Sequence, residues 1–412
     1  MLRDKFKLNL NSKLIKSVKS SFLLTIARGS TALLTAIWLT ICARSLAPYE
    51  LGNLTLIIAL GSIFTVLSDF GLQSAVAIDV AKHFRINFLM IKLVIRKRLI
   101  LSLLSSVLLI VFYMISATGK DIVLPLIYAI TFFAISGYNT LSAAMRSLNR
   151  VLPQVIIDIA GPAFLLVIGT IFIKLGFGLQ AIVGIYPVIK IVSFMALYFS
   201  SHKYFGEESI DELPKLKLKN NWYYGLANLF TYIYSSIDIW LVALISGSAI
   251  SGRYAILSRI LEVVMIPSLA IGQQSVVHAV NIDSDRKNLH DVIKLSLLAV
   301  LSTLPAVAFI VIFAHIIISF IFGYYILGLS SVLILLMVSA PAGAFILSTS
   351  FASSIRSQKI FIYSYGLGLI LNVSLNLIFI PFYGSFGAAM ANLFSDVVLA
   401  LLVLVALMKN SK

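Results

Sequence analysis

The chain has 412 residues, of which 60% are hydrophobic and only 12% are charged, and its mean hydropathy is +1.02. These values exclude a soluble globular protein and indicate a polytopic membrane protein. The excess of basic residues, 32 Lys and Arg against 16 Asp and Glu, does not indicate nucleic-acid binding, because these residues lie in short segments between apolar runs.

The first apolar run, residues 20–43, is long enough to cross a bilayer and yet contains Arg28. An arginine near a helix centre costs about 2.5–3.5 kcal/mol on insertion scales, so its charge should face protein or water. One helical face carries Ser21, Thr25, Arg28, Ala32 and Thr35. Two interpretations stay open: Arg28 lines a cavity and binds an anion, or its side chain reaches back to the headgroups, about 12 Å away.

Apolar runs bounded by charges, prolines and turn residues predict an all-α protein with about twelve spans. The segment 315–327 is too short to span and could extend the ninth helix. The predicted spans are 20–43, 53–77, 99–117, 122–145, 154–173, 178–199, 222–246, 253–276, 292–314, 328–352, 360–380 and 385–408.

The loops between these spans differ strongly in charge. Successive loops lie on alternate sides of the membrane, and the loops on one side contain only four basic residues, Arg44, Lys120, Lys174 and Arg253. By the positive-inside rule, both termini are expected to be cytoplasmic. The loops on the basic side contain Arg3, Lys5, Lys7, Lys13, Lys16, Lys19, Lys82, Arg85, Lys92, Arg96, Lys97, Arg98, Arg146, Arg150, Lys203, Lys215, Lys217, Lys219, Arg286, Lys287, Lys294, Arg356, Lys359, Lys409 and Lys412.

The longest hydrophilic segment divides the chain nearly in half. We predict an N-lobe over residues 1–200, a cytoplasmic linker over 201–221 and a C-lobe over 222–412. Because each lobe has six spans, the two enter the membrane in the same sense, which predicts a parallel repeat with the substrate between the lobes. Weak matches between the halves support this: Gly52 with Gly252, Gln73 with Gln273, Val76 with Val276, Trp38 with Trp240, Arg146 with Arg356 and Phe177 with Phe386.

Several further ionisable residues fall inside predicted spans, where such groups are functional candidates. Asp238 shares a polar face with Tyr224, Asn228, Thr231 and Ser235, so it is a candidate proton or cation site or a partner of an arginine across the cleft. Arg259 and Glu262 are three residues apart and could neutralise each other. Asp69 is a further coupling candidate, whereas Asp158, Lys190 and Asp396 are interpreted as mostly structural.

Catalytic signatures are missing from the sequence. The five histidines form no metal-ligand cluster, no Walker A motif is present, and no nucleophile has a plausible base beside it. The single cysteine, Cys42, provides neither a disulfide nor a pair of thiolate ligands. We therefore expect no metal, no cofactor and no enzymatic activity.

Two stretches carry a resemblance to a known family. ARSLAPYELGNLTLIIALGSIFTVLSDFGLQSA, from Ala43 to Ala75, resembles the early segment of polysaccharide-export flippases. IDIWLVALISGSAISGRYAILSRILEVVMIPSLAI, from Ile237 to Ile271, resembles their mid-chain signature, with an Ile-Asp pair and Gly-x-Tyr-x-x-x-x-Arg before a proline. The chain thus resembles Wzx-type O-antigen and related lipid-linked oligosaccharide flippases of the MATE/MOP exporter superfamily.

This resemblance implies a V-shaped pair of six-helix lobes around a hydrophilic cavity. It implies an inner-membrane protein of lipopolysaccharide biosynthesis that moves undecaprenyl-pyrophosphate-linked oligosaccharide to the periplasmic leaflet, coupled to H⁺ or Na⁺, with membrane lipids, a polysaccharide polymerase and a chain-length regulator as partners. Lipid II flippases typically have further helices that this chain lacks. Drug-exporting relatives bind cations through cavity carboxylates, so a cation-coupled multidrug antiporter is the alternative.

The candidate residues follow from combining the spans with this resemblance. For the pyrophosphate and glycan we expect Arg28, Thr25, Thr35, Arg259 and Asn228, because a lipid-linked pyrophosphate needs cations and hydrogen-bonding groups in a wet cavity. For the coupling ion we expect Asp238, Asp69 or Glu262, whose protonation or cation binding would lower the affinity for the anion on the release side.

Overall fold

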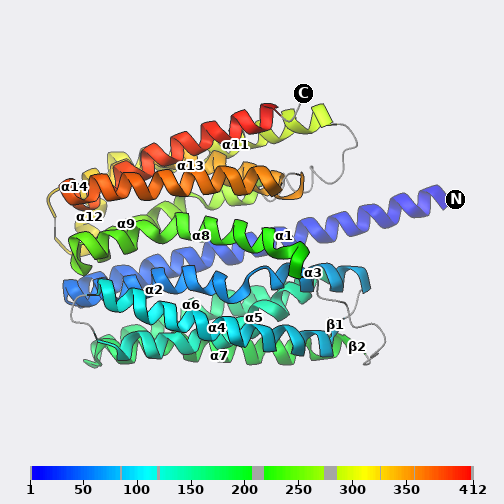
Figure 1. The fold of residues 1–412 in the computed structure, drawn as a ribbon, viewed down its shortest axis with the longest axis horizontal. Coiled ribbons are helices and arrows are strands. Elements are labelled where there is room, and N and C mark those ends of the chain that lie inside the picture. Colours follow the sequence, from blue (N-terminus) through cyan, green and yellow to red (C-terminus); the bar gives the residue numbers. More distant parts are fainter. Residues whose placement is uncertain are drawn as a thin grey trace.

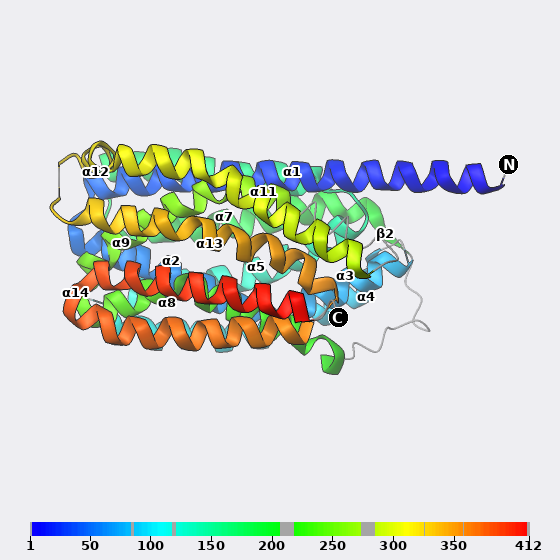
Figure 2. The ribbon, with the colours of Figure 1, turned by 90° about the horizontal axis from the view of Figure 1, so that it is seen from above.

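The computed structural model describes residues 2–83, 86–117, 121–206, 218–272, 285–324, 326–356 and 358–409. Nearly all of them are helical, and most helices run along one common direction (Figure 1). The N and C labels lie at the same end of this bundle in both views, as an even number of spans requires (Figures 1 and 2). We call this end the terminal end and the opposite end the distal end.

The described residues of the first half form seven α-helices. Two short strands, β1 (Ile86–Asn87) and β2 (Phe205–Gly206), pair in parallel at the terminal end, after the 3₁₀ turn η1 (His202–Tyr204). The helices are α1 (Leu2–Ser45), α2 (Pro48–Asp69), α3 (Leu72–His83), α4 (Phe88–Ser116), α5 (Val123–Ser147), α6 (Leu152–Lys174) and α7 (Leu179–Ser201).

The second half packs beside the first (Figure 1) and contacts it chiefly through α2. Its helices contact one another extensively, α13 with α14, α14 with α8, and α11 with α13. Most of the predicted linker, residues 207–217, lies outside the described residues. The helices are α8 (Leu218–Ser246), α9 (Ser248–Val264), α11 (Asp285–Ile312), α12 (Ala314–Phe322), α13 (Leu329–Arg356) and α14 (Gln358–Lys409).

The described residues confirm an all-α polytopic membrane protein. Ten helices are long and apolar enough to span a bilayer, and α9 with the bent continuation Ile266–Gly272 makes an eleventh. The stretch Ile362–Val405 counts once among the ten, but Gly384 within it is non-helical, with φ 55° and ψ −132°. Because about 20 residues cross a bilayer, this break leaves two spans, and the total is the predicted twelve.

Several predicted spans differ from the structure in their limits. Helix α1 begins at Leu2 and α4 at Phe88, because basic residues are compatible with helix and an apolar criterion detects only the lipid-facing part. The run 53–77 is divided where Phe70, at φ 39°, ends α2. The run 253–276 bends by 45° after α9, and the part beyond residue 272 lies outside the described residues. The segment after 312 forms the separate helix α12.

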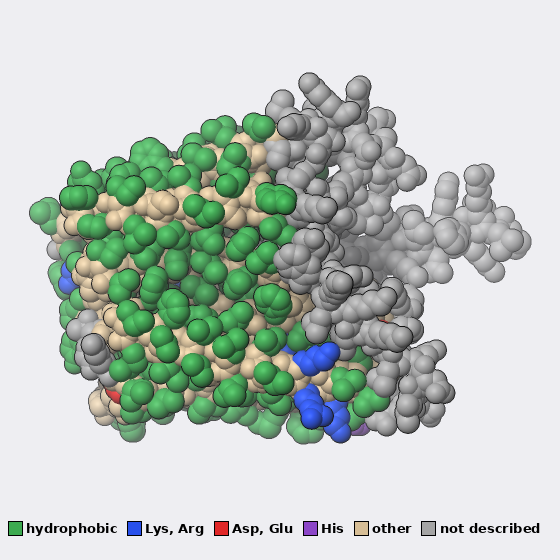
Figure 3. Space-filling view, viewed as in Figure 1, with side chains coloured by type: hydrophobic (Ala, Val, Ile, Leu, Met, Phe, Trp, Pro, Cys, Tyr) green, Lys and Arg blue, Asp and Glu red, His purple; other side chains and the backbone are tan. Residues whose placement is uncertain are grey.

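The surface is apolar where the bilayer should lie. Hydrophobic side chains cover most of the described face in Figure 3, and Lys and Arg side chains gather near the terminal end. On α4, Ile100 and Leu103 are 71% and 60% exposed. A soluble protein would not expose such a continuous apolar surface, so these residues face lipid.

Two glycines join the halves at the distal end. A Cβ on Gly252, in α9, would lie 2.8 Å from both Cα and N of Gly52, in α2. A Cβ on Gly52 would lie 2.0 Å from the carbonyl oxygen of Ser248. These glycines correspond to each other in the predicted repeat, and residues related by a two-fold axis touch only when they lie close to that axis. The contact is the one that a two-fold repeat would produce, and the division into two lobes stays a prediction.

Replacing Gly252 with alanine should destabilise the protein, because the added Cβ overlaps the α2 backbone, which cannot move away as a flexible side chain would. Overpacking of this kind costs about 1–3 kcal/mol. Gly178→Ala is the matched control, since a Cβ there meets no atom within 4 Å. Thermal unfolding in detergent should show a lower Tm for Gly252→Ala alone; equal Tm values for the two variants would show that the helices are not in backbone contact.

Candidate functional site

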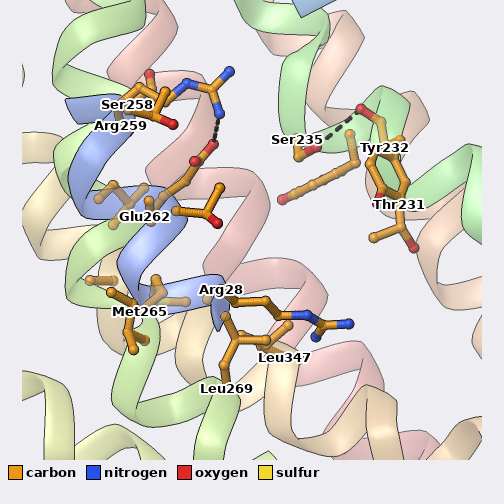
Figure 4. Close-up of a pocket in the computed structure, with 18 of the residues that line it drawn as sticks. Arg28, Thr231, Tyr232, Ser235, Ser258, Arg259, Glu262, Met265, Leu269 and Leu347 are labelled. Atoms are coloured by element: carbon orange, nitrogen blue, oxygen red, sulfur yellow. Dashed lines mark hydrogen bonds and ion pairs between the residues drawn. The ribbon is translucent and has the colours of Figure 1, made fainter. Parts of the chain in front are cut away.

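A cavity of about 720 Å³ lies between the two halves. Helices α1, α6 and α7 line it on one side, and α8, α9 with its continuation, α13 and α14 on the other. Its charged lining comprises three cations, Arg28, Lys190 and Arg259, and four carboxylates, Asp158, Asp238, Glu262 and Asp396. Figure 4 shows part of this lining, with Arg28 apart from the Arg259 and Glu262 pair.

The lobes meet at the distal end of this cavity. Besides the Gly52 and Gly252 contact, Arg44 at the end of α1 donates to the carbonyl oxygens of Phe320 and Ile321 in α12, and its guanidinium lies 4.9 Å from the Phe320 ring centroid. The lining residues of α6 and α9 lie in the halves of those helices nearer the terminal end, whereas those of α1 lie past its midpoint, toward the distal end. The cavity therefore lies near the middle of the interface, on the terminal side of the distal contacts.

Proline determines how α1 docks against α6. Pro162 has no N–H, so the carbonyl of Asp158, four residues earlier, has no helical donor. The Thr31 hydroxyl donates to that carbonyl oxygen at 2.9 Å. Since an unpaired carbonyl in an apolar bundle costs several kcal/mol, this bond holds α1 against α6. It places Arg28, one turn before Thr31, beside the cavity.

Arg28 is exposed, and no hydrogen bond or ion pair joins it to any other residue that the structure describes. Arg259 differs, because it binds Glu262 at 2.5 Å within the same helix (Figure 4). The guanidinium of Arg28 is thus available for an anion, whereas the charge of Arg259 is already shared with a carboxylate.

Asp238 and Asp396 belong to a buried polar network in the second half. Asp238 accepts hydrogen bonds from the Tyr254 hydroxyl at 2.6 Å, the Asn392 amide at 2.8 Å and the backbone N–H of Ile239 at 2.8 Å. Asp396 accepts from the Tyr234 hydroxyl at 2.7 Å. These hydrogen bonds hold both carboxylates in fixed positions at the cavity wall, Asp238 through three donors and Asp396 through the Tyr234 hydroxyl.

The cavity brings together five of the eight sequence-predicted site residues: Arg28, Thr35, Asp238, Arg259 and Glu262. The other three lie elsewhere. Thr25 is buried and donates to the carbonyl oxygen of Ser21 at 3.0 Å, while Asn228 is exposed outside the cavity lining.

Asp69 lies at the end of α2 and forms an ion pair with Arg98 of α4. The sequence pattern assigns Arg98 to a loop, but its side chain is fully buried and also donates to the Ser136 carbonyl and to the Thr140 hydroxyl at 2.6 Å. Arg98 is buried because it lies on the helix face opposite the exposed Lys92, Arg96 and Lys97. Asp69 and Arg98 therefore connect α2, α4 and α5.

Sequence analysis assigned mostly structural roles to three residues that line the cavity: Asp158, Lys190 and Asp396. The spacing of Asp158 and Pro162 was a usable signal, since a proline four residues after a polar residue frees its carbonyl. Asp396 and Asn392 are likewise four apart, and so share one face of α14. For Lys190 no local pattern was available.

The family model for polysaccharide biosynthesis proteins matches residues 17–276, more than half of the chain. The chain belongs to the polysaccharide biosynthesis protein family. This confirms the family predicted from the two sequence stretches. No curated protein matches the chain in sequence.

Solved structures share the fold of this polysaccharide biosynthesis protein. The lipid II flippase MurJ, in an inward closed conformation, aligns with a TM-score of 0.75 at 16% identity, covering 94% of this chain and 87% of that one. An inward-facing multidrug resistance MATE family transporter of the MOP superfamily aligns with a TM-score of 0.67 at 17% identity, covering 96% and 98%. A MOP superfamily transporter from Pyrococcus furiosus, for which a binding pocket of reverse polarity is described, aligns with a TM-score of 0.60 at 18% identity, covering 96% of both chains. These likenesses confirm the MATE-like architecture.

Removing one member of the Asp69 and Arg98 pair should destabilise this family member. Asp69→Leu leaves a buried guanidinium without its carboxylate, which lowers the free energy of unfolding by about 3–5 kcal/mol. Arg98→Met likewise leaves the carboxylate without its cation. The double variant should recover most of the loss, because neither charge then remains. Thermal unfolding of the four proteins measures this; an Asp69→Leu variant as stable as the parent would show that the pair is not structural.

Proposed function

We propose that this protein moves an undecaprenyl-pyrophosphate-linked oligosaccharide, such as an O-antigen repeat unit, from the cytoplasmic to the periplasmic leaflet by alternating access. The observation that carries the proposal is Arg28, a cation in a cavity between two lobes that no described residue neutralises. A pyrophosphate presents several anionic oxygens that a guanidinium binds in pairs, and the glycan needs a wet, polar passage through hydrocarbon. The polyprenyl tail stays in lipid.

The family supports a pathway that builds polysaccharide, and the fold is shared with a lipid II flippase and with transporters. Both observations favour transport over catalysis, and so agree with the expectation that the chain is not an enzyme. In this proposal the protein lies in the bacterial inner membrane with both termini cytoplasmic, and the terminal end of the bundle faces the cytoplasm. A polymerase and a chain-length regulator would act on the product after release.

Coupling to an ion gradient is the second part of the proposal. Of the three carboxylates expected from sequence, Asp69 is bound to Arg98 outside the cavity lining and Glu262 is bound to Arg259. Asp238 lines the cavity and has no cationic partner among the described residues, as is also true of Asp396. Binding of H⁺ or Na⁺ at these two carboxylates would bias the lobes toward one conformation.

A cation-coupled antiporter for cationic small molecules is the alternative. The cavity lining contains four carboxylates against three cations, and the carboxylates lie mainly in the second half. A cationic drug would bind that wall. The position of Arg28 without a partner favours an anionic substrate.

Removing the charge of Arg28 should abolish most of the transport. Arg28→Ala loses charge-assisted hydrogen bonds worth about 1.5–3 kcal/mol each, so transport should fall tenfold or more. Arg28→Lys should retain part of it, because the charge stays while the bidentate geometry is lost. Lys174→Ala, which removes an exposed basic residue outside the cavity lining, should leave transport unchanged.

The measurement is flipping of a fluorescent polyprenyl-pyrophosphate oligosaccharide in proteoliposomes at matched protein amount. Normal transport by Arg28→Ala would rule out the pyrophosphate role. If the wild-type protein instead exports cationic dyes and ignores the lipid, the antiporter alternative holds.

Asp238→Asn should uncouple transport from the ion gradient. The amide keeps the shape of the side chain but neither takes up a proton nor holds a cation by charge. Flipping should then proceed at the same reduced rate with and without an imposed proton or sodium gradient, whereas the wild type responds to one of them. Asp69→Asn tests the competing site. If the flipping rate responds to the gradient in Asp238→Asn but not in Asp69→Asn, Asp69 and not Asp238 is the coupling residue.

A further inference from the structure

The cavity contains a second cation that the proposed function leaves without a role. Lys190 lies on α7, lines the cavity from the same lobe as Arg28, and is partly exposed. No hydrogen bond or ion pair joins its ammonium to a residue that the structure describes. An ammonium at this depth is costly unless water, a partner or a ligand neutralises it.

The nearby carboxylate does not account for Lys190. Asp158 interacts electrostatically with this lysine, but no ion pair forms between them among the described residues. Both oxygens of Asp158 are already occupied: one accepts a hydrogen bond from the Tyr138 hydroxyl and the other from the Gln154 amide at 3.2 Å. The carboxylate is thus held toward its neighbours on α5 and α6, while the lysine extends from α7 into the cavity.

The packing of the helices gives the depth of Lys190 relative to Arg28. The Trp38 indole of α1 donates to the Tyr186 hydroxyl of α7 at 3.1 Å, and its ring fits against Gly169 of α6. Because α7 runs opposite to α1, Lys190, four residues after Tyr186, is level with about residue 34 of α1. Arg28 is six residues nearer the terminal end, which corresponds to about 9 Å along the helix.

Arg259 lines the same cavity from the second half. It interacts electrostatically with Tyr186, one turn from Lys190, and it is bound to Glu262. An anion at this depth would therefore meet one cation already neutralised by a carboxylate and one cation without a partner. Lys190 would therefore attract the anion more strongly than Arg259 does.

We propose that Lys190 is a second binding residue for the phosphate groups of the substrate, deeper in the cavity than Arg28. The inference rests on the proposed function. Arg28 binds the phosphates first, near the terminal end, and Lys190 binds them after they have moved about 9 Å toward the distal end. Two cations at successive depths lower the cost of moving an anion through the cavity, because the charge always has a partner nearby.

Geranylgeranyl diphosphate is a suitable probe, with geranylgeraniol as the uncharged control. The full-length protein in lipid nanodiscs is treated with an amine-acylating reagent, and modification of Lys190 is measured by mass spectrometry relative to Lys294, which is exposed on α11. The diphosphate should reduce modification of Lys190 at least threefold, and the alcohol should not. In Arg28→Gln, the protection should persist but require a higher probe concentration.

Binding of the same probe separates Lys190 from a merely structural residue. Lys190→Gln should weaken binding tenfold or more, while Lys190→Arg, which keeps the charge, should stay within threefold of the parent. Modification of Lys190 that the diphosphate does not change, in a protein that still loses binding on Arg28→Gln, would overturn the role of Lys190 and leave the proposed function standing. A wild-type protein that does not bind the diphosphate at all would overturn both.

Discussion

A charge inside a bilayer must be paired within the protein or face water, and this constraint divides the ionisable residues of the chain into two groups. Asp69 and Arg98 are paired in the interior of the first lobe, and Arg259 is paired with Glu262 on one helix. Arg28 and Lys190 have no such partner among the described residues, and both line the cavity. Because the lipid-facing surface is apolar, these two cations are the ones to which the proposed function assigns the anionic substrate.

Backbone contacts between the two halves lie on either side of the cavity. Glycines 52 and 252 let α2 and α9 touch at the distal end, and Arg44 joins α1 to α12 there. Toward the terminal end the halves also touch through a glycine, since a Cβ on Gly225 of α8 would lie 2.8 Å from the carbonyl carbon of Phe70, while Pro162 and Thr31 hold α1 against α6. The proposed alternating access requires the distal contacts to open, and the glycine pair, which closes without side-chain interdigitation, suits a contact that must form and break repeatedly.

The spans, the family and the position of Arg28 on a polar helix face could be predicted from sequence. Hydrocarbon imposes the long apolar runs, and a strongly disfavoured charge in such a run is visible without a structure. The two glycines that align in the predicted internal repeat lie in contact with each other in the structure. The break at Phe70 and the burial of Arg98 could not be predicted, because each depends on a neighbouring helix. Lys190 carried no local signal, since its availability depends on the hydrogen bonds that already occupy Asp158 on another helix.

The most direct test of the account is the accessibility of the cavity from the two faces of the membrane. Thr35→Cys places a thiol in the cavity lining, and the single native cysteine, Cys42, is buried and can be replaced by serine. A membrane-impermeant thiol reagent is then applied to sealed vesicles of each orientation. Alternating access predicts labelling of residue 35 from both faces, with geranylgeranyl diphosphate slowing labelling from the face at which the termini lie. Labelling from one face only, under every ion gradient, would contradict the account.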